Sequence, residues 1–202
     1  MEQHPKPRRP TPDADLTELI EAVASPQSRA EIASVTAALV IAAGRDGGPT
    51  VGARLVSLAD VVGLDTLAAL WRDADPVSLP GALWTLYLLR QWCHVQADEV
   101  CRLWRVGAGY GEADALVAGV DNDADSDAVA AMTDAILHSA YRGDFAVALE
   151  RAAACFRVIA TGRRHAARCE DPAAEYQRAQ RNEQAARDLT RAARLWRAGM
   201  LR

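Results

Sequence analysis

No proline occurs between Pro80 and Pro172, and apolar residues recur through that stretch at helical spacing. Residues three, four and seven positions apart lie on one face of an α-helix, so this spacing predicts amphipathic helices. No Asn-Gly turn separates runs of alternating apolar and polar residues, which would be typical of β-hairpins. The chain of 202 residues is therefore predicted to be all-α, an irregular bundle of eight to ten helices with a long C-terminal helix.

Capping residues and glycines place the first helices. A first helix is predicted over residues 13–24, where apolar residues lie on one face. A second begins after Ser28, with Glu31 three residues later as in a capping box, and ends at Gly44. The predicted buried face of this second helix comprises Ile32, Val35, Leu39 and Val40.

The strongest single helix is predicted from Leu79 or Pro80 to His94, with Ser78 as its cap. Apolar residues surround most of its circumference, and such a helix is either central to the fold or buried in an interface. A later helix is predicted over residues 127–141. Its expected inward side chains are Val129, Met132, Ile136 and Leu137.

Charge divides the chain into three predicted parts. Residues 1–12 contain four prolines and basic residues, which is typical of a disordered arm. Residues 13–162 form the expected helical core domain, and residues 163–202 the basic C-terminal part. From Arg151 to Arg202 there are 12 arginines against five acidic residues. The basic C-terminal helix within residues 163–202 is therefore expected to pack on the acidic core or on a second protomer.

The last helix is predicted from Asp171-Pro172 to Ala198. Ala179, Ala186 and Ala193 repeat every seven residues, a small-residue seam that lets a second helix approach closely. Its arginines and those of the N-terminal arm are candidates for phosphate or protein contacts. The candidate interaction residues are Arg8, Arg9, Arg178, Arg181, Arg187, Arg191, Arg194, Trp196 and Arg197.

Several motifs favour ordinary structure over chemistry. Residues 58–67 resemble a helix-turn-helix core, but the second helix carries two aspartates that phosphates would repel. Residues 141–149 resemble the middle of a tetratricopeptide repeat but occur once, and one copy cannot stack into a solenoid. Residues 121–127 alternate carboxylates as a calcium loop does, without its glycine and late glutamate.

The cysteine and histidine spacings fit no structural zinc site, so we predict no metal and no cofactor. A nucleophilic pair of Cys93 or Cys155 with His138 stays open as an alternative. The basic N-terminus is followed by acidic residues instead of an apolar segment, and no long uncharged apolar stretch occurs. We therefore expect a cytoplasmic protein that does not associate with membranes, with its cysteines as thiols.

The stretches Leu79–Arg90 and Gly143–Ala152 resemble a family of uncharacterised helical proteins from GC-rich bacteria. The resemblance covers about residues 51–162 and implies a helical, cytoplasmic protein, with no activity or site residue to transfer.

The sequence favours a non-enzymatic interaction or scaffold protein that forms a homodimer and has an unidentified protein partner. One alternative is a nucleic-acid-binding regulator that uses the basic arm and the arginine-rich last helix. A second is a small-molecule or metal-dependent enzyme with its site in a helical pocket. No catalytic residue is assigned.

Overall fold

The computed structural model describes residues 25–119, 125–166 and 171–202, and this part of the chain contains ten helices and no strand. The all-α prediction and its long last helix are confirmed. The expected arm 1–12 and helix 13–24 lie outside the described residues. The helices are α2 (Pro26–Asp46), α3 (Gly48–Val56), α4 (Leu58–Val62), α5 (Leu64–Trp71), α6 (Leu79–Val95), α7 (Ala97–Ala108), α8 (Glu112–Ala118), α9 (Ser126–Arg142), α10 (Phe145–Ala166) and α11 (Pro172–Arg197).

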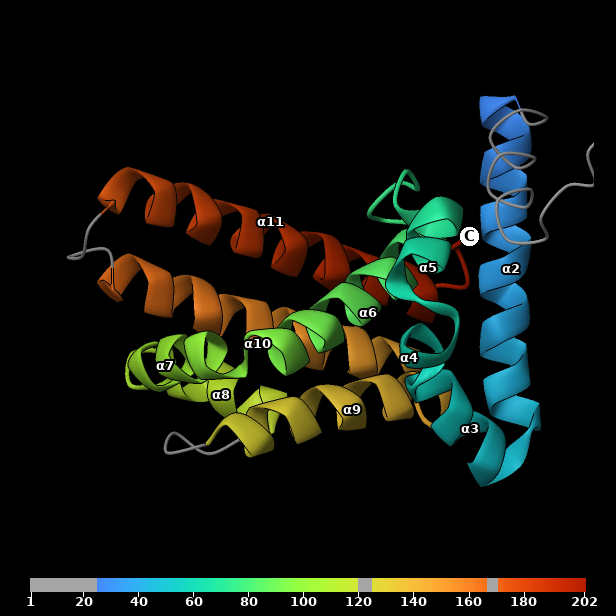
Figure 1. The fold of residues 1–202 in the computed structure, drawn as a ribbon. Helices are drawn as coiled ribbons and strands as arrows, with labels where there is room; N and C mark the ends of the chain where they lie inside the picture. The colour runs from blue at the N-terminus through green and yellow to red at the C-terminus, as the bar shows by residue number, and fades with distance from the viewer. Residues whose placement is uncertain (1–24, 120–124, 167–170) are drawn as a thin grey trace, which may run out of the picture.

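Helix α10 lies at the centre and packs against α6, α7, α8, α9 and α11 (Figure 1). α11 runs back along α10, so the two form a long antiparallel hairpin. Ala179, Ala186 and Ala193 of α11 are fully or almost fully buried, as the seven-residue repeat predicts. The helix along which α11 packs belongs to the same chain, so this seam is already occupied without a second protomer.

Two glycines allow α7 and α10 to cross with their backbones in contact. A Cβ atom on Gly107 would lie 1.9 Å from the Val158 carbonyl oxygen, and one on Gly162 would lie 2.0 Å from that of Leu103. Both distances are far below van der Waals contact, so only glycine fits at either position. Gly162 does not interrupt α10, which continues to Ala166, and the division expected after Gly162 falls inside this helix.

Helix α6 lies in the core of the chain. Of the two locations predicted for it, the centre of the fold or an interface, the structure shows the first. The hydroxyl of Ser78 accepts a hydrogen bond from the Gly81 amide (3.2 Å), as the predicted cap requires. At the same end, the Leu79 amide donates to the Arg202 carbonyl oxygen (2.8 Å), which ties the C-terminal residues to the start of α6. The buried apolar side chains of α6 include Leu83, Leu86, Tyr87 and Leu89, and the predicted inward residues of α9 are all buried.

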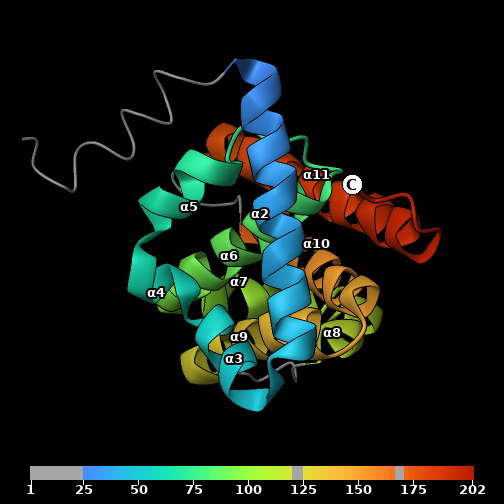
Figure 2. The same cartoon turned by 90° about the vertical axis from the view of Figure 1, so that its right-hand side faces the viewer.

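The predicted buried face of α2 is wrong for three of its four residues, and only Val40 is half-buried against the core. Ile32, Val35 and Leu39 are 41%, 59% and 63% exposed. The opposite face is turned toward the body of the molecule. Figure 2 shows α2 running in front of the other helices, on the side that faces the viewer. Small residues make this contact possible, because a Cβ atom on Gly44 would lie 2.7 Å from that of Tyr141. The residues that α2 buries are Ala33, Ala37, Ile41 and Gly44.

A pair of tyrosines joins α3, α6 and α9. The Tyr87 hydroxyl donates to the Leu55 carbonyl oxygen (2.6 Å), so the proton of the Tyr141 hydroxyl is the one shared between the two tyrosines (2.5 Å). Both side chains are completely inaccessible to solvent. Burial raises the pKa of Tyr87 to about 12 and holds the pKa of Tyr141 well above its usual value.

We predict that Gly162→Ala destabilises the fold by about 1–3 kcal/mol, because the new methyl group overlaps the Leu103 carbonyl oxygen. Gly109→Ala is the matched control at the end of α7. No atom there lies closer than 3.7 Å to the new Cβ, so its stability should be unchanged or up to about 1 kcal/mol higher. Urea unfolding measures both, and equal midpoints for the two variants would contradict the crossing.

We also predict a loss of stability in alkali. The pKa of the Tyr87 hydroxyl is about 12 in the folded chain, against an ordinary value of 10.0. The hydroxyl therefore stays protonated to a higher pH when the chain is folded. Its contribution is therefore complete below pH 10 and falls by about 2–3 kcal/mol as the pH rises to 12. Urea unfolding between pH 9 and pH 12 measures this fall. Tyr87→Phe should make the decline shallower, and an unchanged slope in that variant would refute the assignment.

Candidate functional site

Three of the predicted arginines meet a fourth in an open hollow between α10 and α11. Arg187, Arg191 and Arg194 follow one another at four- and three-residue spacing on α11, and Arg157 of α10 faces them. The hollow has a volume of about 620 Å³, and we call these four residues the arginine trough. Sequence reasoning did not single out Arg157, because its position depends on how α10 and α11 align in their hairpin.

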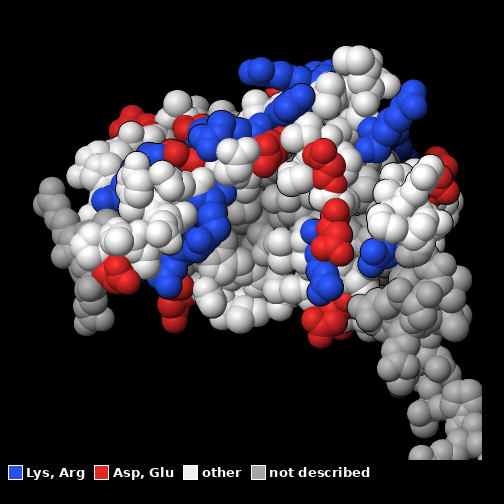
Figure 3. Space-filling model, turned by 90° about the horizontal axis from the view of Figure 1, so that it is seen from above, with Lys and Arg blue, Asp and Glu red and all other residues white. Residues whose placement is uncertain are grey.

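Part of the trough's charge is neutralised within the chain. Arg157 donates to Asp114 of α8 (2.8 Å), and the carboxylate of Glu183, which also lines the hollow, lies 3.9 Å from the Arg187 guanidinium. Within the described residues, Arg191 has no hydrogen bond or ion pair. Figure 3 views the molecule from above, where α11 lies, and blue and red side chains are interspersed on this face. The trough is therefore a local basic spot on a surface of mixed charge.

The remaining predicted residues of α11 lie apart from the trough contacts. Arg178 pairs with Glu175, and Arg181 is exposed. Arg197 makes two hydrogen bonds to Glu150 of α10 (2.5 and 2.7 Å), which lower the pKa of that carboxyl group. The structure thus brings together only part of the predicted set. Arg8 and Arg9 lie outside the described residues.

Trp196 is a packing residue. Its ring meets the Phe145 ring edge to face, with centroids 4.8 Å apart. The Arg45 guanidinium lies 5.0 Å from the Trp196 ring centroid, close enough for a cation–π contact between α2 and α11. The indole of α11 therefore contacts side chains of two other helices, α10 and α2. The prediction assigned this ring to an interface, but its contacts lie within one chain.

Two buried arginines tie distant helices together. Arg90 of α6 donates to both carboxylate oxygens of Asp60 (3.0 and 2.9 Å) and to Asp134 of α9 (2.6 Å). Arg163 of α10 donates to Glu99 of α7 (3.2 Å) and Glu175 of α11 (2.7 Å). Charges buried this deeply need such partners, so both clusters serve the fold.

The possible cysteine nucleophiles do not meet a histidine. Cys93 and Cys155 are completely buried against each other, and hydrogen bonding to Cys93 together with burial raises the pKa of the Cys155 thiol. His138 is exposed on α9. Both thiols are buried whereas the histidine is exposed, so the structure does not bring Cys93 or Cys155 together with His138 as a nucleophilic pair. In the described parts of the chain, no group of three or more histidine, cysteine, aspartate or glutamate side chains is placed to hold a metal ion.

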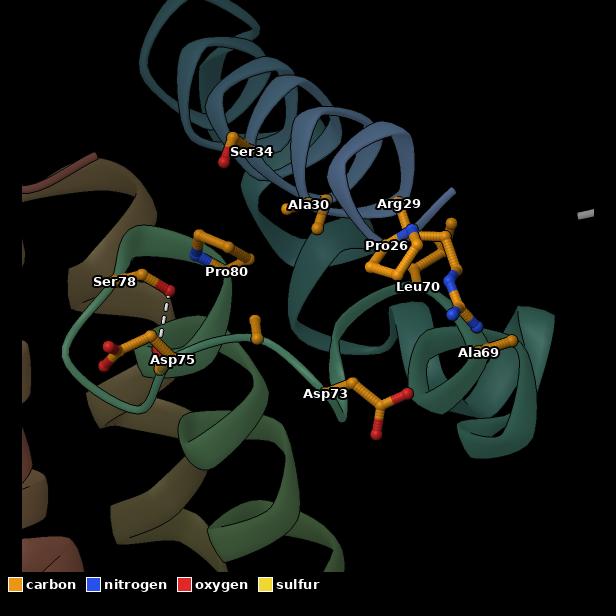
Figure 4. Close-up of a pocket in the computed structure, with 12 residues that line it drawn as sticks. Pro26, Arg29, Ala30, Ser34, Ala69, Leu70, Asp73, Asp75, Ser78 and Pro80 are labelled. Carbon is orange, nitrogen blue, oxygen red and sulfur yellow. Dashed lines mark hydrogen bonds between the residues drawn. The ribbon is translucent and has the colours of Figure 1, made fainter. Parts of the chain in front are cut away.

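A cavity of about 300 Å³ lies between the start of α2, the end of α5 and the loop that leads to α6 (Figure 4). Its walls are mostly alanine, proline and leucine, with Arg29 and Asp73 at the sides. The polar groups nearest the loop are used locally, since the Ser78 hydroxyl donates to the Asp75 carbonyl oxygen (2.6 Å). This volume is at the lower limit for a small-molecule site.

A second surface was missed by the sequence reasoning, which had placed it in the core. We call it the outer face of α2. Its residues lie opposite the buried face and are Ser28, Ile32, Val35, Leu39, Ala42 and Asp46. Exposed Glu31 and Arg45 flank it on one side. Three large apolar side chains at helical spacing are thus exposed to solvent, while three of the four residues that α2 buries are alanine or glycine.

Searches of protein-family models, curated proteins and solved structures gave no match to this chain. The resemblance of residues 51–162 to an uncharacterised family therefore stays a prediction. Within the described residues, no helix has both the length and the apolar character needed to cross a lipid bilayer.

Proposed function

We propose that this chain is a non-enzymatic interaction protein, a scaffold that assembles with protein chains through the outer face of α2. The observation that carries the proposal is the exposure of Ile32, Val35 and Leu39 on the side of α2 that faces away from the body. A homodimer is among the assemblies that we propose. The cytoplasm is the proposed compartment, in keeping with the buried thiols of Cys93 and Cys155.

The energetic argument concerns where large apolar side chains are placed. Full burial of a Val, Leu or Ile side chain stabilises a protein by roughly 1.5–3 kcal/mol relative to exposure. In α2 that gain is left unused at three positions, while the inner face is filled by two alanines, one glycine and a single large residue, Ile41. Single exposed apolar residues are ordinary, but an aligned row along one helix is typical of a docking face.

The arginine clusters support a structural role in place of catalysis. Asp60, Asp134, Glu99 and Glu175 each form an ion pair with a buried arginine. These pairs hold helices together at points far from one another in the sequence. The result is a rigid body on which an exposed helix is presented, which is what a scaffold requires.

The proposal is tested by photo-crosslinking of the full chain in its host cells. A benzoylphenylalanine replaces Val35, and a second chain carries it in place of Leu116, which is 81% exposed on α8. We expect irradiation to attach a protein chain at position 35 and to give far less product at position 116. Equal products at the two positions, or no product at position 35, would contradict a docking face on α2.

A second candidate function, binding of nucleic acid or another phosphate polymer, is favoured by the arginine trough. Three arginines on one face of α11, with Arg157 of α10 opposite, gather guanidinium groups that can form charge-assisted hydrogen bonds to phosphates. The interspersed acidic side chains in Figure 3 weaken this candidate relative to the first.

If the second candidate is right, affinity for a fluorescent oligonucleotide should fall steeply with salt. The double substitution R191A/R194A should reduce the slope of log K against log salt by about 1–2, since each phosphate contact contributes roughly 0.7–0.9. Arg72→Ala is the control, because Arg72 is exposed at the end of α5 and pairs only with its neighbour Asp73 among the described residues. Fluorescence anisotropy measures the binding, and an unchanged slope in the double variant removes the trough from this role.

A further inference from the structure

The outer face of α2 has the spacing of a coiled-coil seam. Ser28, Ile32, Val35, Leu39, Ala42 and Asp46 alternate steps of four and three residues, as the a and d positions of a heptad do. At 3.6 residues per turn, this row lies on the side of the helix opposite Ala37, which is completely buried. The seam therefore follows the full length of α2 and points directly away from the body (Figure 2).

We propose that the outer face of α2 pairs with the same face of a second copy of this chain, with the two helices antiparallel. The two-fold axis then crosses the seam midway between Val35 and Leu39, at the level of position 37 along the helix. Val35 packs against Leu39 of the second copy, and Ile32 packs against its Ala42. At each end Ser28 faces Asp46 of the second copy, where a hydroxyl can donate to a carboxylate.

Charge selects both the partner and the direction. Glu31 and Arg45 lie fourteen residues apart on the same flank of the seam, at equivalent heptad positions. In the antiparallel register Glu31 of each copy stands opposite Arg45 of the other, which gives two symmetric ion pairs. In a parallel pair, neither residue would face an opposite charge, and the two Asp46 carboxylates would meet across the seam.

These features favour a second copy over other occupants. A closed two-fold dimer requires a surface that is complementary to itself, and the outer face of α2 meets that requirement in both its apolar layers and its flanking charges. The chain's own residues 13–24 are the competing occupant. They contain four acidic residues and no basic one, so they offer Glu31 no partner.

The inference rests on the proposed function, and its test is sedimentation equilibrium of the purified full chain. We expect a concentration-dependent mass that approaches twice 21.7 kDa. Glu31→Arg should weaken dimerisation about tenfold, because two attractive pairs become repulsive. Arg45→Glu should weaken it similarly. The double substitution E31R/R45E should restore the affinity to within about threefold, although Arg45 also contacts Trp196.

Leu39→Glu should abolish the dimer, while Leu116→Glu, on α8, should leave it unchanged. Circular dichroism confirms that each variant is folded. A full chain that stays monomeric at high concentration overturns self-pairing. If residue 35 still crosslinks to a different protein in cells, the docking function stands and only the partner is wrong. Crosslinks from residue 35 to residues 13–24 of the same chain would overturn both.

Discussion

The crossing of α7 and α10 depends on the absence of two side chains. At Gly107 and Gly162 each helix backbone takes the space that a Cβ atom would need on the other. The close approach also determines the electrostatics, because Arg163 follows Gly162 directly and its guanidinium lies 3.2 Å from Glu99 of α7. A wider crossing would separate that pair and leave a buried cation with one partner fewer. The position of α10, and with it that of α11, follows from this contact.

Much of the fold could be predicted from the sequence, because the long helices carry strong local signals. Ser78 and Asp171 cap their helices as expected, and the small-residue seam of α11 is buried. The orientation of α2 could not be predicted in this way. Both of its faces have helical spacing, and the usual rule buries the larger residues. Here the fit of Gly44 against Tyr141 decides instead, and that fit involves residues nearly a hundred positions apart.

The candidate site shows the same division between local and long-range information. The spacing of Arg187, Arg191 and Arg194 is enough to place them on one face of a helix. Whether an arginine is available depends on what lies opposite, as the pairing of Arg197 with Glu150 illustrates. That pairing depends on the alignment of α10 with α11, which no local pattern encodes. Trp196 was assigned to a surface for the same reason, since its contact with Phe145 is invisible in the sequence.

The central position of α10 has a consequence during synthesis. The ribosome makes α6 to α9 before α10, the helix against which all four pack, and it makes α11 after α10. At ordinary elongation rates, α7 has left the ribosome for a time on the order of seconds before α10 is complete. Throughout that interval the face of α7 that α10 covers has no final partner, and the Arg202 carbonyl oxygen that accepts a hydrogen bond from the first residue of α6 does not yet exist. The nascent chain thus exposes the apolar face of α7 to its surroundings. Protection of that face by a chaperone at this stage would have a direct physical cause.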